Sequence, residues 1–301
     1  MQHRRLKLNV NGLLLLDKPL GFSSNQALSK IKWLFSPIKA GHTGTLDPMA
    51  TGLLPICLGE ATKFSRFLLD ADKTYEAVIK LGYSSSTGDS EGKLTQLNNI
   101  ELPTLFSIKK ILNMFIGETK QLPPMYSALK YKGQALYTFA RKGIEVKREK
   151  RIIQISSIHL LGYEKDLVRI EVRCSKGTYI RTLAGDIGNK LKVGGYLLKL
   201  RRTAIGRLTI NNAISLEALE KIKPEKRVSL LQPPQTLLEG YKVIHLTLKE
   251  EGLIKDGQTV LVNSAVTGNF SLYNERNIFI GVGEVCSNKL LKAKRLMSLK
   301  V

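Results

Sequence analysis

Apolar residues along the first third of the chain recur with periods that change from one segment to the next. Residues 12–16 (Gly-Leu-Leu-Leu-Leu) form a continuous apolar run followed by a turn-rich Lys-Pro-Leu-Gly segment, which predicts a short buried strand. Ser23 or Ser24 can cap a helix that runs to about residue 35. Residues 60–69 have a helical spacing of apolar side chains. Residues 73–83 place them at every second position, which predicts a strand.

The rest of the chain mixes the two periods without a regular strand–helix–strand alternation. Helical spacing covers residues 104–115 and 178–191, and strands are predicted at 151–161, 167–174 and 195–207. Charged and proline-rich residues at 221–234 indicate a connection, and short strand-like runs follow from about residue 241. We therefore predict an α+β fold with a mixed, mainly antiparallel sheet and a small β-rich C-terminal domain.

The charge of the chain narrows the class of partner. Lysine and arginine total 47 against 25 aspartates and glutamates, which gives a formal net charge of +22. An excess of this size favours a polyanion, because phosphate contacts release condensed counterions. The basic residues concentrate at 129–151, 190–202 and 289–300. Contact with nucleic acid is the functional interpretation, and a solvated charged face is the alternative.

Side chains that could form a disulfide framework or a metal site are few and scattered. Cys57, Cys174 and Cys286 lie far apart, and the four histidines do not cluster. We therefore expect no metal site, and this cysteine usage fits a reducing cytosol. No apolar run reaches the roughly 18 residues of a membrane span, so we expect a cytoplasmic protein without a membrane segment or signal peptide.

The densest chemical signal is the loop at residues 41–52 (Gly-His-Thr-Gly-Thr-Leu-Asp-Pro-Met-Ala-Thr-Gly). Its glycines let the backbone approach a ligand closely, and Pro48 restricts the conformation of Asp47 before it. A stiff loop of this kind would present one carboxylate, which can act as a nucleophile at a sugar carbon. A simple Asp-Pro turn is the alternative. The loop also lacks the Lys-Ser/Thr pair of a phosphate-binding loop.

Five segments distributed over the chain resemble the motifs of the TruB-type tRNA pseudouridine synthases. The loop, extended to residue 55, resembles the signature loop of that family. The other four segments are residues 17–24 (Asp-Lys-Pro-Leu-Gly-Phe-Ser-Ser), 73–75 (Lys-Thr-Tyr), 121–130 (Gln-Leu-Pro-Pro-Met-Tyr-Ser-Ala-Leu-Lys) and 174–183 (Cys-Ser-Lys-Gly-Thr-Tyr-Ile-Arg-Thr-Leu). The resemblance implies an enzyme that isomerises a T-loop uridine of tRNA, at tRNA position 55, to pseudouridine. It implies base flipping, and it implies neither a cofactor nor a metal.

The resemblance assigns catalytic roles to three residues. Asp47 is expected to be the nucleophile or general base at the ribose. Tyr75 is expected to stack on the uracil ring, although a strand tyrosine is otherwise half-buried packing. Arg181 is expected to pair with Asp47 and favour its ionised form, the alternative being a solvent-facing helix arginine.

Five further residues are expected to bind the RNA substrate. His42 would fill the space left by the flipped uridine, or would be an ordinary loop histidine. Lys18 would contact phosphate or, alternatively, brace the active-site loops. Tyr179 lies in the 174–183 motif, and Lys130 and Arg202 belong to the basic segments.

The resemblance also divides the chain into regions with separate tasks. Residues 1–235 would form the catalytic domain, with a thumb insertion at about 121–150, and residues 241–301 a PUA-like RNA-binding domain. The related catalytic subunits of guide-RNA particles lack the thumb, so we expect a self-sufficient monomer that binds the T-arm of tRNA. Three alternatives remain at this point: a synthase for other RNAs, a tRNA-folding chaperone, and a basic DNA-binding protein. The last lacks any recognisable DNA-binding motif.

Overall fold

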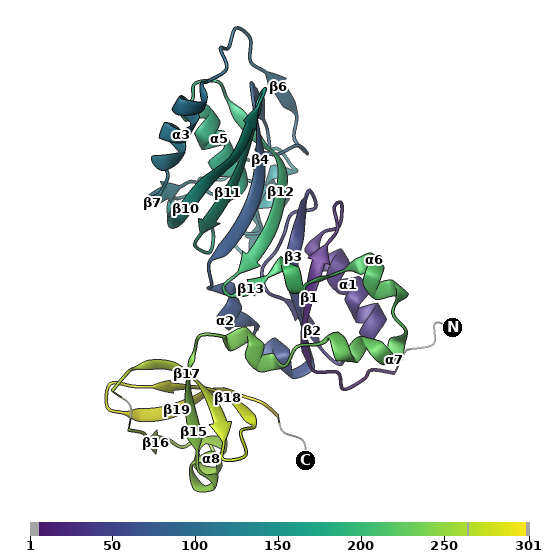
Figure 1. Ribbon diagram of the computed structural model, residues 1–301, viewed down its shortest axis with the longest axis vertical. Coiled ribbons are helices and arrows are strands. Elements are labelled where there is room, and N and C mark those ends of the chain that lie inside the picture. Colours follow the sequence, from purple (N-terminus) through teal and green to yellow (C-terminus); the bar gives the residue numbers. More distant parts are fainter. Residues whose placement is uncertain (1–5, 264, 299–301) are drawn as a thin grey trace.

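One ten-stranded sheet runs through most of the molecule (Figure 1). The computed structural model describes residues 6–263 and 265–298. The strand order is β14-β1-β3-β12-β4-β11-β10-β7, with β2 pairing with β3 and β13 with β12. The strands are β1 (Gly12–Lys18), β2 (Ala40–His42), β3 (Ala50–Leu58), β4 (Lys73–Leu81), β7 (Gly117–Gln121), β10 (Arg151–Glu164), β11 (Leu167–Cys174), β12 (Gly195–Ile205), β13 (Leu208–Thr209) and β14 (Ile214–Ser215). Two pairings, β1 with β14 and β3 with β12, are parallel, and the others are antiparallel. The predicted α+β fold with a mixed sheet is confirmed.

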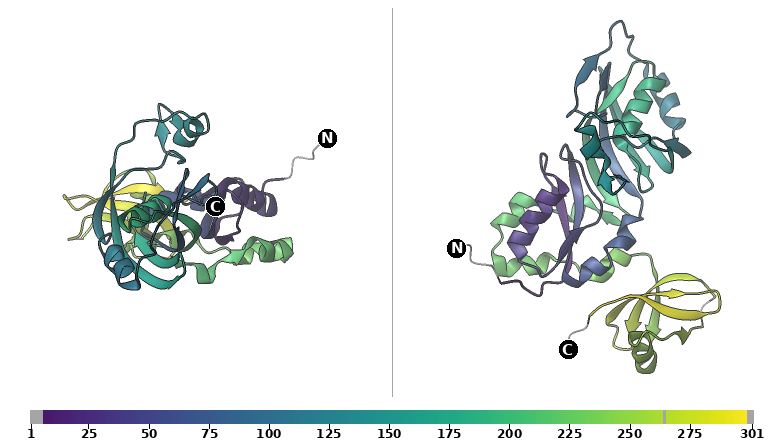
Figure 2. Two further views of the ribbon diagram at one scale, coloured as in Figure 1. Left: turned by 90° about the horizontal axis from the view of Figure 1, so that it is seen from above. Right: turned by 180° about the vertical axis from the view of Figure 1, so that it is seen from behind.

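Helices cover the two halves of this sheet separately. In Figures 1 and 2, α3 and α5 pack on the half formed by β4, β10, β11 and β12, and α1, α6 and α7 lie beside β1 and β3. The helices of the large sheet are α1 (Ser24–Phe35), α2 (Ser65–Leu69), α3 (Leu105–Asn113), α5 (Ile180–Lys190), α6 (Leu216–Lys221) and α7 (Pro224–Arg227), with 3₁₀ turns η1 (Gly59–Lys63), η2 (Ile210–Asn212), η3 (Val228–Leu230) and η4 (Pro234–Leu238).

Local sequence explains where α1 begins and how closely α5 approaches the sheet. Ser23, one of the two predicted caps, caps α1, and it also forms a reciprocal capping box with Gln26. In α5, a Cβ at Gly188 would lie 2.3 Å from the carbonyl carbon of Gly194, so only glycine permits this contact just before β12. The close packing sets the position of the N-terminal turn of α5, which carries Arg181.

The segment at residues 121–150, which we call the thumb segment, arches away from the sheet. It contains the short hairpin β8 (Lys130–Tyr131) and β9 (Gln134–Ala135) and the helix α4 (Leu136–Ala140). The view from above in Figure 2 shows the part that carries α4 standing clear of the other elements. A second small hairpin consists of β5 (Tyr83–Ser85) and β6 (Leu94–Gln96).

The C-terminal part forms a second sheet with the order β15-β17-β18-β19-β16. Its elements are β15 (Lys242–Leu246), α8 (Leu248–Lys255), β16 (Val260–Leu261), β17 (Gly268–Asn274), β18 (Phe279–Val285) and β19 (Leu290–Leu296). It has its own core, yet Phe279 also packs edge-on against Phe64 at 5.4 Å between ring centroids and joins a cluster with Leu13 and Leu53. Apolar packing therefore ties the small sheet to the large one.

The structure differs from the sequence prediction in three elements. The helix predicted at residues 60–69 is divided into η1 and α2 at Phe64, whose ring is buried in the cluster shared with the C-terminal part. The predicted loop at 41–52 is shortened by β2 and β3 at its ends. Helix α8 interrupts a region for which only strands were predicted. In the part of the chain that the structure describes, no helix is long and apolar enough to cross a membrane.

Candidate active site

A cavity of about 580 Å³ opens between β4, β12, the loop before β3, the N-terminal turn of α5 and the thumb segment. Several polar groups from distant parts of the chain converge there. Of the eight residues predicted from the sequence, five line the cavity: Asp47, Tyr75, Tyr179, Arg181 and Arg202. Because β4 and β12 are adjacent strands, they carry Tyr75 and Arg202 into the same wall. This concentration of titratable and aromatic side chains makes the cavity the candidate active site.

The loop that carries Asp47 is held in one conformation by hydrogen bonds from outside it. The Ser24 hydroxyl at the start of α1 donates to the Leu46 carbonyl at 3.0 Å and accepts from the Leu46 backbone N–H at 2.8 Å. The Gly21 N–H donates to the Pro48 carbonyl at 2.9 Å. These contacts fix the backbone on both sides of Asp47, which explains why the 17–24 motif accompanies the 41–52 loop.

Arg181 connects three elements of the site through one guanidinium group. Its Nε lies 3.0 Å from Asp47 Oδ2, and its Nη1 lies 3.2 Å from Asp89 Oδ2. Its Nη2 donates to the carbonyl of Tyr126 in the thumb segment at 2.7 Å. With 6% of its surface exposed, Arg181 is not the solvent-facing helix residue of the alternative interpretation. The predicted pair with Asp47 is present in the structure.

Asp89 is a member of the site that sequence reasoning missed. Its carboxylate is buried, and Oδ1 accepts from the Thr87 hydroxyl at 2.5 Å and from the Glu91 N–H at 3.1 Å. Asp89 is thus a second acceptor for the Arg181 guanidinium. It fixes the plane of that group, which then presents Nε to Asp47. The Thr-Gly-Asp-Ser-Glu-Gly stretch at 87–92 was a visible polar turn. Nothing in its spacing indicated a partner in α5.

Two opposing influences set the pKa of Asp47. Partial burial in the cavity wall raises it above the usual range, and the nearby Asp89 carboxylate acts in the same direction. The Arg181 guanidinium and, more weakly, the Lys18 ammonium lower it. The prediction that Arg181 favours the ionised form therefore holds in direction, but burial is the larger effect.

Tyr75 and Tyr179 line the cavity together with Asp47. Tyr75 stands on β4 between Val172 of β11 and Arg202 of β12, and burial raises the pKa of its hydroxyl. Tyr179 precedes α5, and its backbone N–H and carbonyl both bond to the side-chain amide of Gln121 at 2.8 and 3.1 Å. Gln121 was read as the start of the thumb segment. In the structure it also anchors the turn that leads to Arg181.

Lys18 and Arg202 lie inside the protein. Lys18 is fully buried, and its ammonium donates to the carbonyls of Pro19 and Phe22 at 2.9 and 2.5 Å. This burial contradicts the predicted RNA contact and fits the bracing alternative. Arg202 is 1% exposed and lines the cavity, and its predicted role in RNA binding stays a prediction. The Arg202 prediction assumed that a basic side chain lies at the surface, as most do.

His42 and Lys130 lie outside the cavity lining. His42 is on β2, where burial and the nearby Arg202 lower the pKa of its imidazole, and its Nδ1 is buried without a hydrogen-bond partner. A neutral ring is the consequence at physiological pH. Lys130 is exposed on β8 of the thumb segment. The predicted roles of both residues in RNA binding stay predictions.

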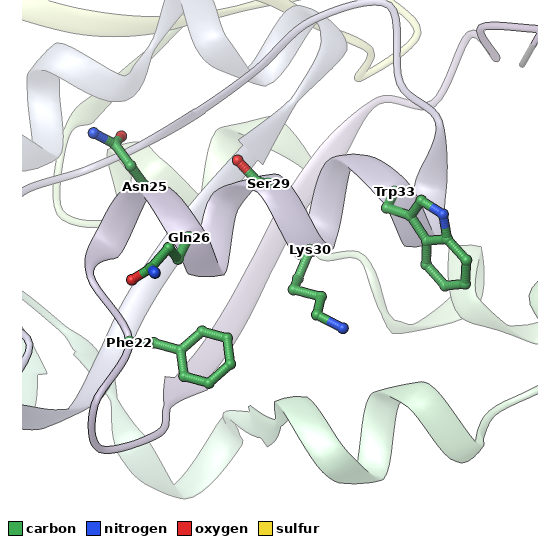
Figure 3. Close-up of a pocket in the computed structure, with 6 residues that line it drawn as sticks. All are labelled: Phe22, Asn25, Gln26, Ser29, Lys30 and Trp33. Atoms are coloured by element: carbon green, nitrogen blue, oxygen red, sulfur yellow. The ribbon is translucent and has the colours of Figure 1, made fainter. Parts of the chain in front are cut away.

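A second hollow lies along the outer face of α1 (Figure 3). Its lining is Phe22, Asn25, Gln26, Ser29, Lys30 and Trp33, and Lys30 pairs with Glu220 at 3.4 Å. Lys30 is the one titratable side chain in this lining, and no His, Asp or Glu of the lining stands beside the Ser29 hydroxyl as a base, so the hollow is a weaker candidate for chemistry. Within residues 6–263 and 265–298, no group of three or more His, Cys, Asp or Glu side chains is arranged to hold a metal ion.

Comparisons with known proteins find related chains and folds. Residues 32–180 match the family described as "TruB family pseudouridylate synthase (N terminal domain)". Residues 181–239 match "tRNA pseudouridylate synthase B C-terminal domain", and residues 243–297 match "Pseudouridine synthase II TruB, C-terminal". The tRNA pseudouridine synthase B of Aromatoleum aromaticum is 48% identical over 99% of this chain and 96% of that protein. The protein of the same name from Dechloromonas aromatica is 46% identical over 99% of both.

Solved structures share the fold at lower identity. A crystal structure of a Cbf5-Nop10-Gar1 complex matches with a TM-score of 0.74 and 24% identity, over 95% of this chain and 84% of that chain. A structure of an H/ACA RNP bound to a substrate RNA containing 2'-deoxyuridine matches with a TM-score of 0.73 and 21% identity, over 98% and 92% of the two chains. At these identities the likeness concerns the fold alone.

Proposed function

The chain belongs to the TruB family of pseudouridylate synthases, and on that premise we propose that it is a tRNA pseudouridine(55) synthase (EC 5.4.99.25). In this proposal it isomerises one uridine in the T-loop of tRNA, with Asp47 as the nucleophile. The observation that carries the proposal is the carboxylate of Asp47 on a braced loop, in ion pair with the buried Arg181 and facing a cavity whose lining includes Tyr75 and Tyr179.

The chemistry exchanges one glycosidic bond for another without a net change of atoms. The C1′–N1 bond of uridine breaks, the base turns, a C1′–C5 bond forms, C5 loses its proton and N1 gains one. An ionised Asp47 can attack C1′ or remove a neighbouring ribose proton, and Arg181 keeps its oxygen aimed at the sugar. Tyr75 presents an aromatic face that can hold the detached uracil while it turns.

Delivery of the uridine requires that the base leave its loop. A flipped base costs a few kcal/mol of stacking and pairing, and a planar side chain in the vacated space recovers part of this cost. We assign that role to His42, whose lowered pKa keeps the ring uncharged. Lys130 on the projecting thumb segment would contact the phosphates of the T-arm, consistent with the net charge of +22.

The regions of the chain are proposed to divide these tasks. Residues 1–235 would bind and isomerise the uridine, and residues 241–301 would bind RNA as a PUA-like domain. The support is that every lining residue of the cavity lies before residue 203, whereas the C-terminal part has its own sheet and core. Because the thumb segment closes the cavity from within this chain, we propose a monomer that needs no partner protein.

Mapping of pseudouridine in unmodified tRNA after incubation with the purified protein tests the proposal. We expect one modified position, in the T-loop, for the natural chain and none for Asp47→Asn. Asp166→Asn is a matched control, because Asp166 pairs with Lys80 outside the cavity and should retain full activity. Modification at several unrelated positions, or none with the natural chain, would contradict the proposed substrate.

A further inference from the structure

Arg202 carries a buried positive charge without a carboxylate beside it. Only 1% of the surface of Arg202 is exposed, yet none of the ion pairs within residues 6–263 and 265–298 involves it. Burial of an unpaired cation is costly, because neutral dipoles compensate the lost water only in part. A residue retained at such a cost in an active-site wall calls for an explanation beyond packing.

The hydrogen bonds of Arg202 connect the parts of the site that Arg181 does not reach. Its Nε donates to the Leu53 carbonyl at 2.8 Å, and its Nη2 donates to the Gly44 carbonyl at 3.3 Å in the loop before Asp47. Tyr75, its cross-strand neighbour on β4, lies close enough for the two side chains to shift each other's pKa. One rigid guanidinium therefore bonds to the catalytic loop and lies beside the side chain of Tyr75.

The backbone around Arg202 is placed as tightly as its side chain. On the other side of β12 its neighbour is Gly52 of β3, and a Cβ at Gly52 would lie 2.3 Å from the Arg202 carbonyl oxygen. Gly52 also has a φ of +104°, which other residues rarely adopt. The guanidinium thus projects from a backbone with little freedom to move, as a positioning group requires.

We propose that Arg202 is a positioning residue for the isomerisation, which holds the Tyr75 hydroxyl and the Gly44 backbone at a constant separation while uracil turns between Tyr75 and Asp47. This inference rests on the proposed function and deepens it. The guanidinium acts through Tyr75 and the loop and does not touch the ribose. Its loss is therefore expected to lower turnover of bound tRNA and to leave tRNA affinity nearly unchanged.

Arg227 offers a matched control for the loss of a buried arginine. Arg227 is 9% exposed, its guanidinium donates to the carbonyls of Ile222, Leu34 and Glu220, and it does not line the cavity. Arg227→Met and Arg202→Met therefore remove the same kind of buried group from two places. We expect comparable losses of melting temperature in the two variants. Only Arg202→Met should lower kcat, by about 100-fold, with KM within about threefold of the natural chain.

A double-mutant cycle with Tyr75→Phe tests whether Arg202 acts through the hydroxyl. If it does, Arg202→Met/Tyr75→Phe falls no more than about threefold below the slower single variant, because both changes remove one shared interaction. Reductions in kcat that multiply would overturn the proposal, and so would a kcat of Arg202→Met no lower than that of Arg227→Met.

Two further measurements keep the result interpretable. If Arg202→Met does not fold, Arg202→Lys keeps the charge but not the planar guanidinium. We expect this variant to have a roughly tenfold lower kcat and the same coupling to Tyr75→Phe. A kcat of Arg202→Lys equal to that of the natural chain would overturn the inference. The proposed function is tested separately, because it fails if the natural chain makes no pseudouridine or modifies several unrelated positions, or if Asp47→Asn still makes pseudouridine.

Discussion

Replacement of Arg181 by methionine removes the group that joins both carboxylates of the site. Asp89 is 2% exposed at its side chain, so the loss leaves its charge buried with only the Thr87 hydroxyl and the Glu91 N–H as partners. Breaking a buried pair on one side costs about 3–5 kcal/mol. The Asp47 side chain is 37% exposed, and water replaces much of what it loses. Most of the destabilisation therefore comes from Asp89.

The catalytic cost has a different origin and can be separated from this destabilisation. Without Arg181 the Asp47 carboxylate loses its orientation and its largest stabilising charge, so we expect kcat to fall by about 100- to 1000-fold, or roughly 3–4 kcal/mol of activation free energy. The double variant Arg181→Met/Asp89→Asn removes the stranded charge. It should regain more than half of the lost unfolding free energy and none of the lost kcat.

Urea unfolding and tritium release from uridine carbon-5 measure the two effects on the same preparations. The unfolding free energy of a domain is about 5–15 kcal/mol, so the single variant should remain folded at 25 °C. Arg227→Met serves again as the control for a lost buried arginine. The reasoning is refuted if Arg181→Met keeps kcat within about threefold of the natural chain, or if the double variant recovers activity together with stability.

Three further outcomes are expected. Because burial raises the pKa of Asp47, the acid limb of the kcat profile should lie above the usual aspartate value of about 3.9, with activity lost as pH falls. The acid limb of Arg181→Lys should lie at a lower pH than that of Arg181→Met, because lysine keeps the positive charge. An acid limb of the natural chain at or below about 3.9 would contradict the raised pKa. The affinity for tRNA, measured by filter binding, should fall steeply and linearly on logarithmic axes as salt rises, and a flat response would exclude a phosphate-driven interaction. Deletion of residues 241–301 should raise KM for tRNA and leave kcat nearly unchanged. The deletion also exposes Phe64, so the melting temperature should fall. A truncated chain that is folded but inactive would place catalytic groups in the C-terminal part.

Local signals explain why some elements were predicted closely. The apolar run at residues 12–16 and the Ser23 cap act within a few residues, so β1 and α1 begin where the pattern placed them. The edge strand β7 has the sequence Gly-Glu-Thr-Lys-Gln, which resembles a loop because an edge strand exposes polar residues. Helix α8 contains Gly252 and has no clear apolar face.

The candidate site shows the same division between local and long-range information. Asp47, Tyr75 and Arg181 were found because motifs mark them, but Asp89 joins them only through a contact with a residue 92 positions away. Arg202 was grouped with a basic surface segment because basic residues usually lie at the surface, and Lys18 was left between phosphate contact and bracing, whereas the fold buries both. The tertiary arrangement of β1, β3 and β12 decides which of these cations are buried, and a local sequence pattern carries no information on that arrangement.

The central claim is that the Asp47 carboxylate performs the chemistry, and Asp47→Asn tests it most directly. The amide keeps the size of the side chain and part of its hydrogen bonding but removes the charge and the nucleophilic oxygen. Tritium release and filter binding on the same preparation should show no detectable pseudouridine, with tRNA affinity within about tenfold of the natural chain, or roughly 1.4 kcal/mol. Retention of more than a few per cent of the natural turnover would contradict the assignment of Asp47 as the essential catalytic residue.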